Sequence, residues 1–387
     1  MSGEPGPSGV GVPPLPGDFV TPDYGSRSLG DLVPAVAAAL GVDAGLPATS
    51  LELPPAQKYV VFLVDGLGFE LLAEHPDDAP FLHELLRGTS PATVGVPSTT
   101  ATSLTSLGTA LTPGSHGVVG FTSRIPGTDN LLNALSWDAS VDARQWQPHQ
   151  TAFARLAAAG VQVTVVNKRE FATSGLTVAG QRGAVYVGAD RAGERLAAVL
   201  AASAQVPSLT YMYDGDLDWT GHRYGVSSLQ WRLQLSMVDA AVEQLRETLP
   251  DDTRVVVVAD HGMVDSPDTS RIDVDDVDGL RDGLALLGGE ARFRHLYCRP
   301  GAVDDVLTSW QAVVGDRAEV LSRDAALDRG WFGPLEAEVR PRLGDVMVAA
   351  RGDFAVMSRS AFPYEARLVG LHGSLTSTEM LVPVLVA

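Results

Sequence analysis

Six carboxylate and imidazole side chains occur in local patterns that suit a metal centre. An Asp and a His stand four residues apart in the segment 218–222, so that on one helical turn or in a tight loop both could reach one ion. An Asp-His pair ends an apolar run at 260–261, another Asp ends one at 65, and a His precedes Gly at 372. Such a set without a thiolate suits divalent ions such as zinc or manganese. The six residues are Asp65, Asp218, His222, Asp260, His261 and His372.

Each of these residues taken alone also has an ordinary structural interpretation. An Asp that ends a strand often forms an Asx turn or caps a helix, and a His beside Gly is often a loop residue. Their joint occurrence, rather than any single motif, favours a metal site.

A run of hydroxyl residues, 98–100, stands immediately before a predicted helix. The ordinary interpretation is an N-cap with spare Ser and Thr. The functional interpretation is a nucleophile for phosphorus, because the helix N-terminus favours anions and a metal ion can lower the pKa of a hydroxyl.

The elements that must position these residues are readable in the chain. Continuous apolar runs predict buried parallel strands, and amphipathic segments between them predict helices. The alternation predicts an α/β fold with a mostly parallel central sheet covered by helices on both faces. In such sheets ligands bind at the carboxyl ends of strands, where Asp65 and Asp260 lie. The predicted strands are 59–65, 162–166, 208–213 and 254–260, and the helices are 31–40, 69–73, 79–86, 100–108, 149–159, 191–204 and 227–247.

The remaining segments predict a tail and an insertion. Residues 1–20 are rich in Pro and Gly and are interpreted as a flexible tail, followed by a single catalytic domain at 21–387. After residue 261 the elements become shorter, with a strand at 291–298, a helix at 303–314 and a strand at 345–350. We expect a smaller inserted subdomain at about 265–365.

Composition excludes several classes of protein. The 47 acidic and 28 basic side chains give a formal charge of −19, which argues against a nucleic-acid polymer or an anionic membrane as partner. One Cys, Cys298, excludes an internal disulfide and a thiolate cluster. No signal peptide or membrane-spanning run is evident, so a cytoplasmic location is expected.

The order of the motifs resembles the alkaline phosphatase superfamily, and within it the nucleotide pyrophosphatase/phosphodiesterase branch. The likeness covers about residues 58–387 and rests on six motifs in order: Val61-Phe-Leu-Val-Asp65-Gly66, Val96-Pro-Ser-Thr-Thr100, Leu111-Thr-Pro-Gly-Ser-His116-Gly117-Val118, Asp218-Trp-Thr-Gly-His222, Ala259-Asp260-His261-Gly262-Met263 and Leu371-His372-Gly373.

The resemblance implies a two-metal hydrolase of phosphodiester or nucleotide pyrophosphate bonds in small-molecule phosphate esters. It implies that one zinc is held by Asp65, Asp260 and His261, and the other by Asp218, His222 and His372. Thr100 is then the nucleophile, bridging toward the first metal and forming a covalent intermediate, with Thr99 as the alternative. In the family pattern His116 is not a ligand, so packing or loop anchoring is expected for it.

Two positions depart from this branch. The aromatic residue that usually follows the nucleophile is Ala101, and the Asn that donates to a phosphoryl oxygen falls at Phe121. Another donor must therefore contact that oxygen, and Thr122, Ser123 and Arg124 are the candidates.

Other functions on the same site stay open. A basic residue such as Arg124 or Lys168 could meet the extra charge of a phosphate monoester, so a phosphomonoesterase is one alternative. A phosphonate hydrolase is a further alternative. Thr100 and the remote Cys298 argue against a sulfatase, and the chain is short for a phosphomutase. An inert binding protein that retains the fold is disfavoured because all six ligand positions are filled.

Overall fold

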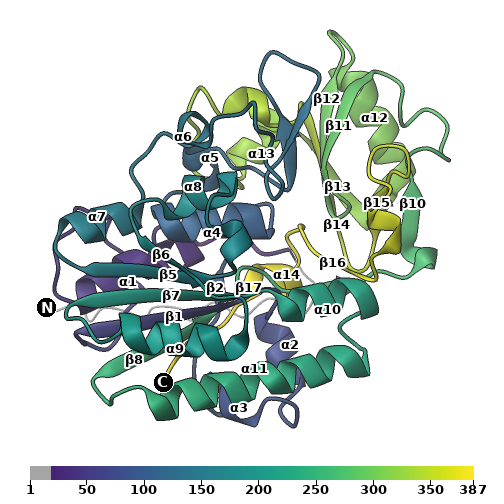
Figure 1. Cartoon of the computed structure of the whole chain (residues 1–387). Helices are drawn as coiled ribbons and strands as arrows, with labels where there is room; N and C mark the ends of the chain where they lie inside the picture. The colour runs from purple at the N-terminus through teal and green to yellow at the C-terminus, as the bar shows by residue number, and fades with distance from the viewer. Residues whose placement is uncertain (1–18) are drawn as a thin grey trace, which may run out of the picture.

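The computed structural model describes residues 19–387, and a six-stranded sheet forms its centre (Figure 1). The strand order is β18-β8-β1-β7-β5-β6; the five strands from β8 to β6 are parallel, and β18 is antiparallel to β8. Residues 59–64 of β1 are all buried, as expected for a strand covered on both faces. The strands are β1 (Lys58–Val64), β5 (Gln162–Asn167), β6 (Val185–Gly188), β7 (Ser208–Asp214), β8 (Thr253–Val258) and β18 (Val384–Val386).

Two groups of helices cover this sheet and share its hydrophobic core. In one group α1, α4 and α7 contact one another, and in the other α11 contacts α3, which contacts α2. The helices are α1 (Leu32–Ala39), α2 (Phe69–Glu74), α3 (Pro80–Leu86), α4 (Thr100–Thr109), α5 (Pro113–His116), α6 (Ala143–Trp146), α7 (Ala152–Ala158), α8 (Gly175–Gln181), α9 (Ala192–Ala202), α10 (Asp216–Tyr224), α11 (Leu229–Thr248), α12 (Val303–Val314), α13 (Arg323–Asp328) and α14 (Ser377–Met380).

A second, antiparallel sheet lies apart from the first, at the upper right of Figure 1. Its order is β11-β12-β14-β13, and α12 packs on it over a hydrophobic core of its own around Trp310. The strands are β11 (Leu284–Glu290), β12 (Phe293–Cys298), β13 (Ala318–Ser322) and β14 (Val346–Ala350). Short pairs complete the described chain: β2 (Ala92–Thr93) with β17 (Leu381–Val382), β3 (Thr122–Arg124) with β4 (Leu131–Asn133), β9 (Val264–Asp265) with β16 (Gly370–Leu371), and β10 (Arg271–Asp273) with β15 (Ala355–Met357).

The α/β architecture with a mostly parallel sheet confirms the predicted fold class. All four predicted core strands are present as β1, β5, β7 and β8. The segment 218–222 lies within helix α10 rather than in a loop. The predicted tail lies outside the described residues as far as residue 18. At its end, Phe19 pairs with Thr376, and the Val20 N–H donates to the Leu375 carbonyl. Their apolar side chains pack against the main core.

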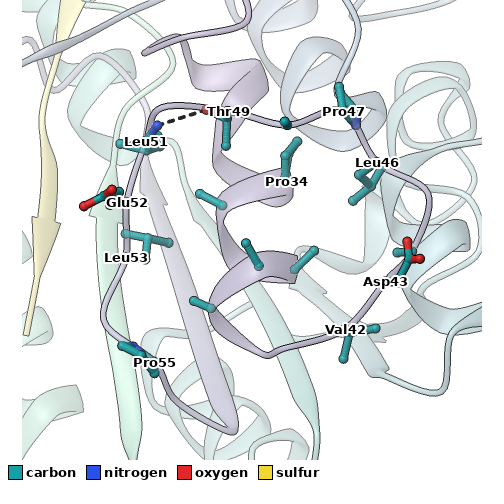
Figure 2. Close-up of a pocket in the computed structure, with 16 residues that line it drawn as sticks. Pro34, Val42, Asp43, Leu46, Pro47, Thr49, Leu51, Glu52, Leu53 and Pro55 are labelled. Atoms are coloured by element: carbon teal, nitrogen blue, oxygen red, sulfur yellow. Dashed lines mark hydrogen bonds between the residues drawn. The ribbon is translucent and has the colours of Figure 1, made fainter.

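A cavity of about 480 Å³ lies beside α1, where residues 42–55 loop around the helix (Figure 2). Small and apolar side chains form most of its wall, and Leu51 N–H donates to the Thr49 hydroxyl at 3.0 Å. Its wall includes two carboxylates, Asp43 and Glu52, and no His, Lys or Arg among the described residues.

Among residues 19–387, no helix combines the length and the apolar composition needed to cross a bilayer.

Candidate metal centre and nucleophile

Asp65, Asp260 and His261 meet at the carboxyl ends of β1 and β8. These strands are parallel neighbours, paired from Lys58 with Thr253 to Leu63 with Val258, so the residues that follow them reach the same edge of the sheet. One ligand atom from each residue lies within 4.8 Å of the others, and all three residues are buried. His261 Nε2 lies 3.3 Å from Asp65 Oδ1 and 3.6 Å from Asp260 Oδ2. We call this set the β1–β8 triad.

Asp218, His222 and His372 form a second set of the same kind, the α10 triad. Their ligand atoms also lie within 4.8 Å of one another. The spacing of four residues puts Asp218 and His222 on one face of α10, with 3.4 Å between Asp218 Oδ2 and His222 Nε2. His372 follows β16, and its ring stacks on that of His261 with centroids 3.6 Å apart. The two triads are therefore adjacent.

The turn after β1 lets α10 come close. Gly66 has a φ of +77°, and a Cβ on it would lie 3.1 Å from both Cα and Cβ of Asp218. A larger residue would therefore be strained and would push Asp218 away from the site.

Backbone carbonyls orient all three imidazoles. The Nδ1 atoms of His222, His261 and His372 lie 2.8 to 3.0 Å from the carbonyl oxygens of Gly370, Gly262 and Ser98 respectively. A carbonyl only accepts, so each Nδ1 carries the proton and donates. Each Nε2 then presents its lone pair toward the carboxylates, which is the arrangement found around metal-ligating histidines.

The electrostatics of the two triads fit divalent cations. Burial, followed by the charges of Asp260 and Asp218, raises the pKa of Asp65, and burial also raises the pKa of Asp218 and Asp260. Burial lowers the pKa of His261 and His372. Asp65 Oδ1, Asp218 Oδ1 and Asp260 Oδ2 are buried without a hydrogen-bond partner. Unpaired buried carboxylates are costly, and bound cations would remove that cost.

Thr100 begins helix α4 and faces the β1–β8 triad. Its hydroxyl lies 3.2 Å from His261 Nε2 and 3.5 Å from Asp65 Oδ2. Thr99 is the N-cap residue, and its hydroxyl bonds instead to Glu290. The local geometry therefore favours Thr100 over Thr99 as the nucleophile.

A pocket of about 320 Å³ opens beside Thr100 and is lined by the α10 triad. Its apolar wall includes Phe121, Leu135 and Tyr364, and no Lys or Arg is among the described lining residues. Arg124 pairs with Asp129 at 2.7 Å and Lys168 with Asp216 at 3.4 Å, and neither lines the pocket.

The three candidates for the phosphoryl-oxygen donor do not line the pocket either. The Thr122 hydroxyl donates to the Gly289 carbonyl at 2.7 Å, Ser123 is buried in β3, and Arg124 bonds within its own hairpin. The donor that takes the place of the family Asn therefore stays open among these candidates.

Sequence reasoning missed two residues beside the nucleophile. The Tyr213 hydroxyl donates to Asp65 Oδ2, the same oxygen that Thr100 approaches. Glu290 ends β11 and lines the pocket; burial raises its pKa to about 8, although the Thr99 hydroxyl and the Phe121 N–H donate to it. Neither has a recognisable signal, since Tyr213 reads as part of a strand and Glu290 as part of a Gly-Gly-Glu turn.

The other noted residues have structural surroundings. His116 is buried and bonded to the Ser106 hydroxyl at 2.9 Å and to Val118 N–H at 3.1 Å, which fits the loop-anchoring role expected for it. Ala101 packs in a small apolar cluster and offers no stacking surface. Cys298 lies in β12, outside both triads.

The chain matches the family model for type I phosphodiesterases/nucleotide pyrophosphatases over residues 59–375. Among solved structures, murine ectonucleotide pyrophosphatase/phosphodiesterase 5 is similar at 17% identity with a TM-score of 0.67, covering 85% of this chain and 88% of that chain. The human protein of that name is similar at 16% identity with a TM-score of 0.65, covering 85% of this chain and 87% of that chain. An inactive threonine-to-alanine variant of the murine protein, in complex with AMP, is similar at 16% identity with a TM-score of 0.66. This match covers 85% of this chain and 87% of that chain. No curated protein matches the chain.

Proposed function

The chain belongs to the type I phosphodiesterase/nucleotide pyrophosphatase family, and on that premise we propose that it hydrolyses phosphodiester or nucleotide pyrophosphate bonds with Thr100 as nucleophile. The observation that carries the proposal is the Thr100 hydroxyl at the N-terminus of α4, 3.2 Å from His261 Nε2, with the α10 triad lining the pocket on its other side.

The two triads are the proposed sites of two divalent ions, zinc or else manganese, because carboxylate and imidazole ligands without thiolate suit these ions. Bound ions would lower the pKa of the Thr100 hydroxyl and stabilise the charge that develops on the phosphoryl and leaving oxygens. Tyr213 would hold Asp65 in place by its hydrogen bond, and the three backbone carbonyls would hold the imidazoles.

In the proposed reaction the Thr100 oxygen attacks phosphorus in line with the ester bond that breaks. The Thr100 proton passes to solvent, and the leaving oxygen departs and takes up a proton from water. Water then attacks the phosphothreonine, which releases the acid product and restores the hydroxyl. The N-terminus of α4, with its unpaired N–H groups, favours the anion at this position.

The pocket favours a diester over a monoester. A monoester dianion brings a second negative charge, and no described lining residue is a Lys or Arg that could meet it. Residue 101 is Ala rather than an aromatic residue, so it offers no ring on which a nucleobase could stack. A cytoplasmic location stays a prediction.

Metal analysis combined with turnover tests this function. We expect about two metal ions per purified chain, hydrolysis of bis(p-nitrophenyl) phosphate and much slower hydrolysis of p-nitrophenyl phosphate. A chelator should abolish the diesterase activity, and added zinc or manganese should restore it. Fewer than one ion per chain together with no diesterase activity would favour the inert binding protein instead.

A further inference from the structure

Helix α11 carries exposed apolar side chains on the face that points away from the core. Leu229, Leu233 and Met237 are 64, 57 and 66% exposed, and their spacing of four residues places them along one ridge of the helix. Trp231 and Leu235 are buried, and each is two residues from Leu233, or about 200° around the helix. In Figure 1 α11 runs along the lower edge of the molecule. We call the three exposed side chains the α11 ridge.

Exposed apolar side chains are concentrated in this part of the chain. Of the ten large hydrophobic side chains that are exposed among the described residues, five lie within residues 219–237. Two of the five, Trp219 and Tyr224, belong to α10, which packs against α11. Single exposed apolar residues are ordinary on a protein surface, whereas a group of them marks an interaction surface. A helix that is apolar on opposite faces is typical of one that is covered on both.

The charge around the α11 ridge differs from that of the chain as a whole. The formal charge is −19, so two copies of the chain repel each other over most of their surfaces. Between residues 229 and 241 the described chain has one acid, Asp239, which is buried and accepts two backbone N–H groups of α3. The one base in this stretch, Arg232, pairs with Asp78 at 2.7 Å. Two copies can therefore meet at the ridge without bringing unpaired like charges together.

The spacing of the α11 ridge is self-complementary. When two α11 helices pack antiparallel across a two-fold axis at Leu233, Leu229 faces Met237 of the partner subunit, and the two copies of Leu233 face each other. Rows of residues four apart interdigitate in the commonest class of helix packing, and a two-fold dimer uses the same patch on both copies. With its flanking Gln and Ala residues the ridge presents on the order of 500 Å² per copy, so a symmetric pair buries about 1,000 Å², at the lower end for a specific interface.

We propose that the α11 ridge is the contact surface of a homodimer, in which α11 packs antiparallel against α11 of a second copy of the chain. The small area predicts a reversible dimer with a dissociation constant of about 10 µM. The proposal does not depend on the diesterase function, because no residue of the ridge lines the pocket beside Thr100 or belongs to either triad.

Sedimentation velocity of the full chain over a range of concentrations tests the proposal. The wild type should pass from monomer to dimer as its concentration rises through about 10 µM. Leu233→Glu places two carboxylates together at the axis and should raise the dissociation constant about hundredfold or more. A wild type that stays monomeric up to about 200 µM would mean that the ridge serves a different partner, and it would overturn the proposal.

Two controls separate the α11 ridge from the general effects of an added acid. Val185→Glu introduces the same acid at a side chain that is 54% exposed on the edge strand β6, and this variant should dimerise like the wild type. Because Leu233 is 57% exposed, Leu233→Glu should melt at the wild-type temperature when both proteins are monomeric. A dimer that persists in Leu233→Glu, or that Val185→Glu weakens equally, would show that the contact lies elsewhere.

Cysteine cross-linking tests the antiparallel register. Leu233→Cys places one thiol from each copy at the two-fold axis, within reach of a disulfide, whereas the two thiols of Leu229→Cys lie about 12 Å apart along the helices. Mild oxidation should therefore link Leu233→Cys into dimers. It should leave unlinked both Leu229→Cys and the wild type, whose single thiol is Cys298. Equal linking of the two variants, or no linking of Leu233→Cys, would refute the proposal.

Discussion

Replacing Thr100 by Ala separates the chemistry from the architecture of the site. The hydroxyl makes two long contacts, at 3.2 Å to His261 Nε2 and 3.5 Å to Asp65 Oδ2, so its loss should cost no more than about 1 kcal/mol of folding free energy. In a chain of this size that lowers the melting temperature by no more than about 2 to 4 °C. The six ligand residues remain, so the metal content should stay at the wild-type value.

Turnover should respond very differently. If Thr100 forms the covalent intermediate, its removal should lower kcat for bis(p-nitrophenyl) phosphate by about a thousandfold or more, or about 4 kcal/mol in activation free energy. Thr100→Ser keeps the hydroxyl and should keep measurable turnover. Acid quenching of the wild type followed by mass spectrometry should find the phosphoryl adduct on Thr100.

Two results would refute this reasoning. The first is a Thr100→Ala variant that keeps its activity and its ions. The second is an adduct on Thr99, or activity that survives Thr100→Ala and disappears in Thr99→Ala. The first result would show that Thr100 is not the nucleophile, and the second would assign that role to Thr99, against the contact of its hydroxyl with Glu290.

Two further predictions concern the α10 triad and a buried imidazole. Asp218→Asn should lower the metal content by about one ion per chain, because only the α10 triad loses a carboxylate. Elemental analysis measures the metal content, and Glu243→Gln is the control. Equal loss of both ions would contradict the division into two triads. Burial lowers the pKa of His116 from 6.5 to about 3, so the folded chain binds fewer protons than the unfolded chain below pH 6.5. The stability from this histidine is complete above pH 6.5 and is lost toward pH 3, at up to about 1.4 kcal/mol per pH unit. In urea unfolding of metal-free protein, His116→Gln should shrink the stability difference between about pH 7 and pH 5 by about 2 kcal/mol; an unchanged difference would mean that His116 does not titrate this way.

The main sheet could be predicted where burial leaves a strong pattern. β1 and β8 are buried along nearly their whole length, so their sequences read as continuous apolar runs. β6 was missed because it is a four-residue edge strand with Val185 exposed, and β18 because it is three residues long. Short edge strands form by pairing with an existing neighbour, and local sequence carries little trace of that pairing.

The candidate site likewise contains residues that the sequence could reveal and residues that it could not. Asp65 and Asp260 could be found because they directly follow strands whose parallel pairing brings their ends together. Glu290 could not, because it belongs to the second sheet and meets Thr99 only through the packing of β11 against the segment at 121–124. Residues contributed by a separate sheet have no fixed spacing from the motif that they complete.

The distribution of charge constrains how this protein can hold a phosphate. The chain has a formal charge of −19, and two of its acids, Asp65 and Asp260, are buried together at the end of the main sheet. The pocket offers no basic side chain from the described lining residues, so positive potential toward a phosphoryl group must come from the proposed ions and from the N-terminus of α4. Glu290 adds little negative charge to this pocket near pH 7, because burial raises its pKa to about 8. The acids of the two triads, by holding the proposed ions, thus remove the need for Lys and Arg at the reacting centre.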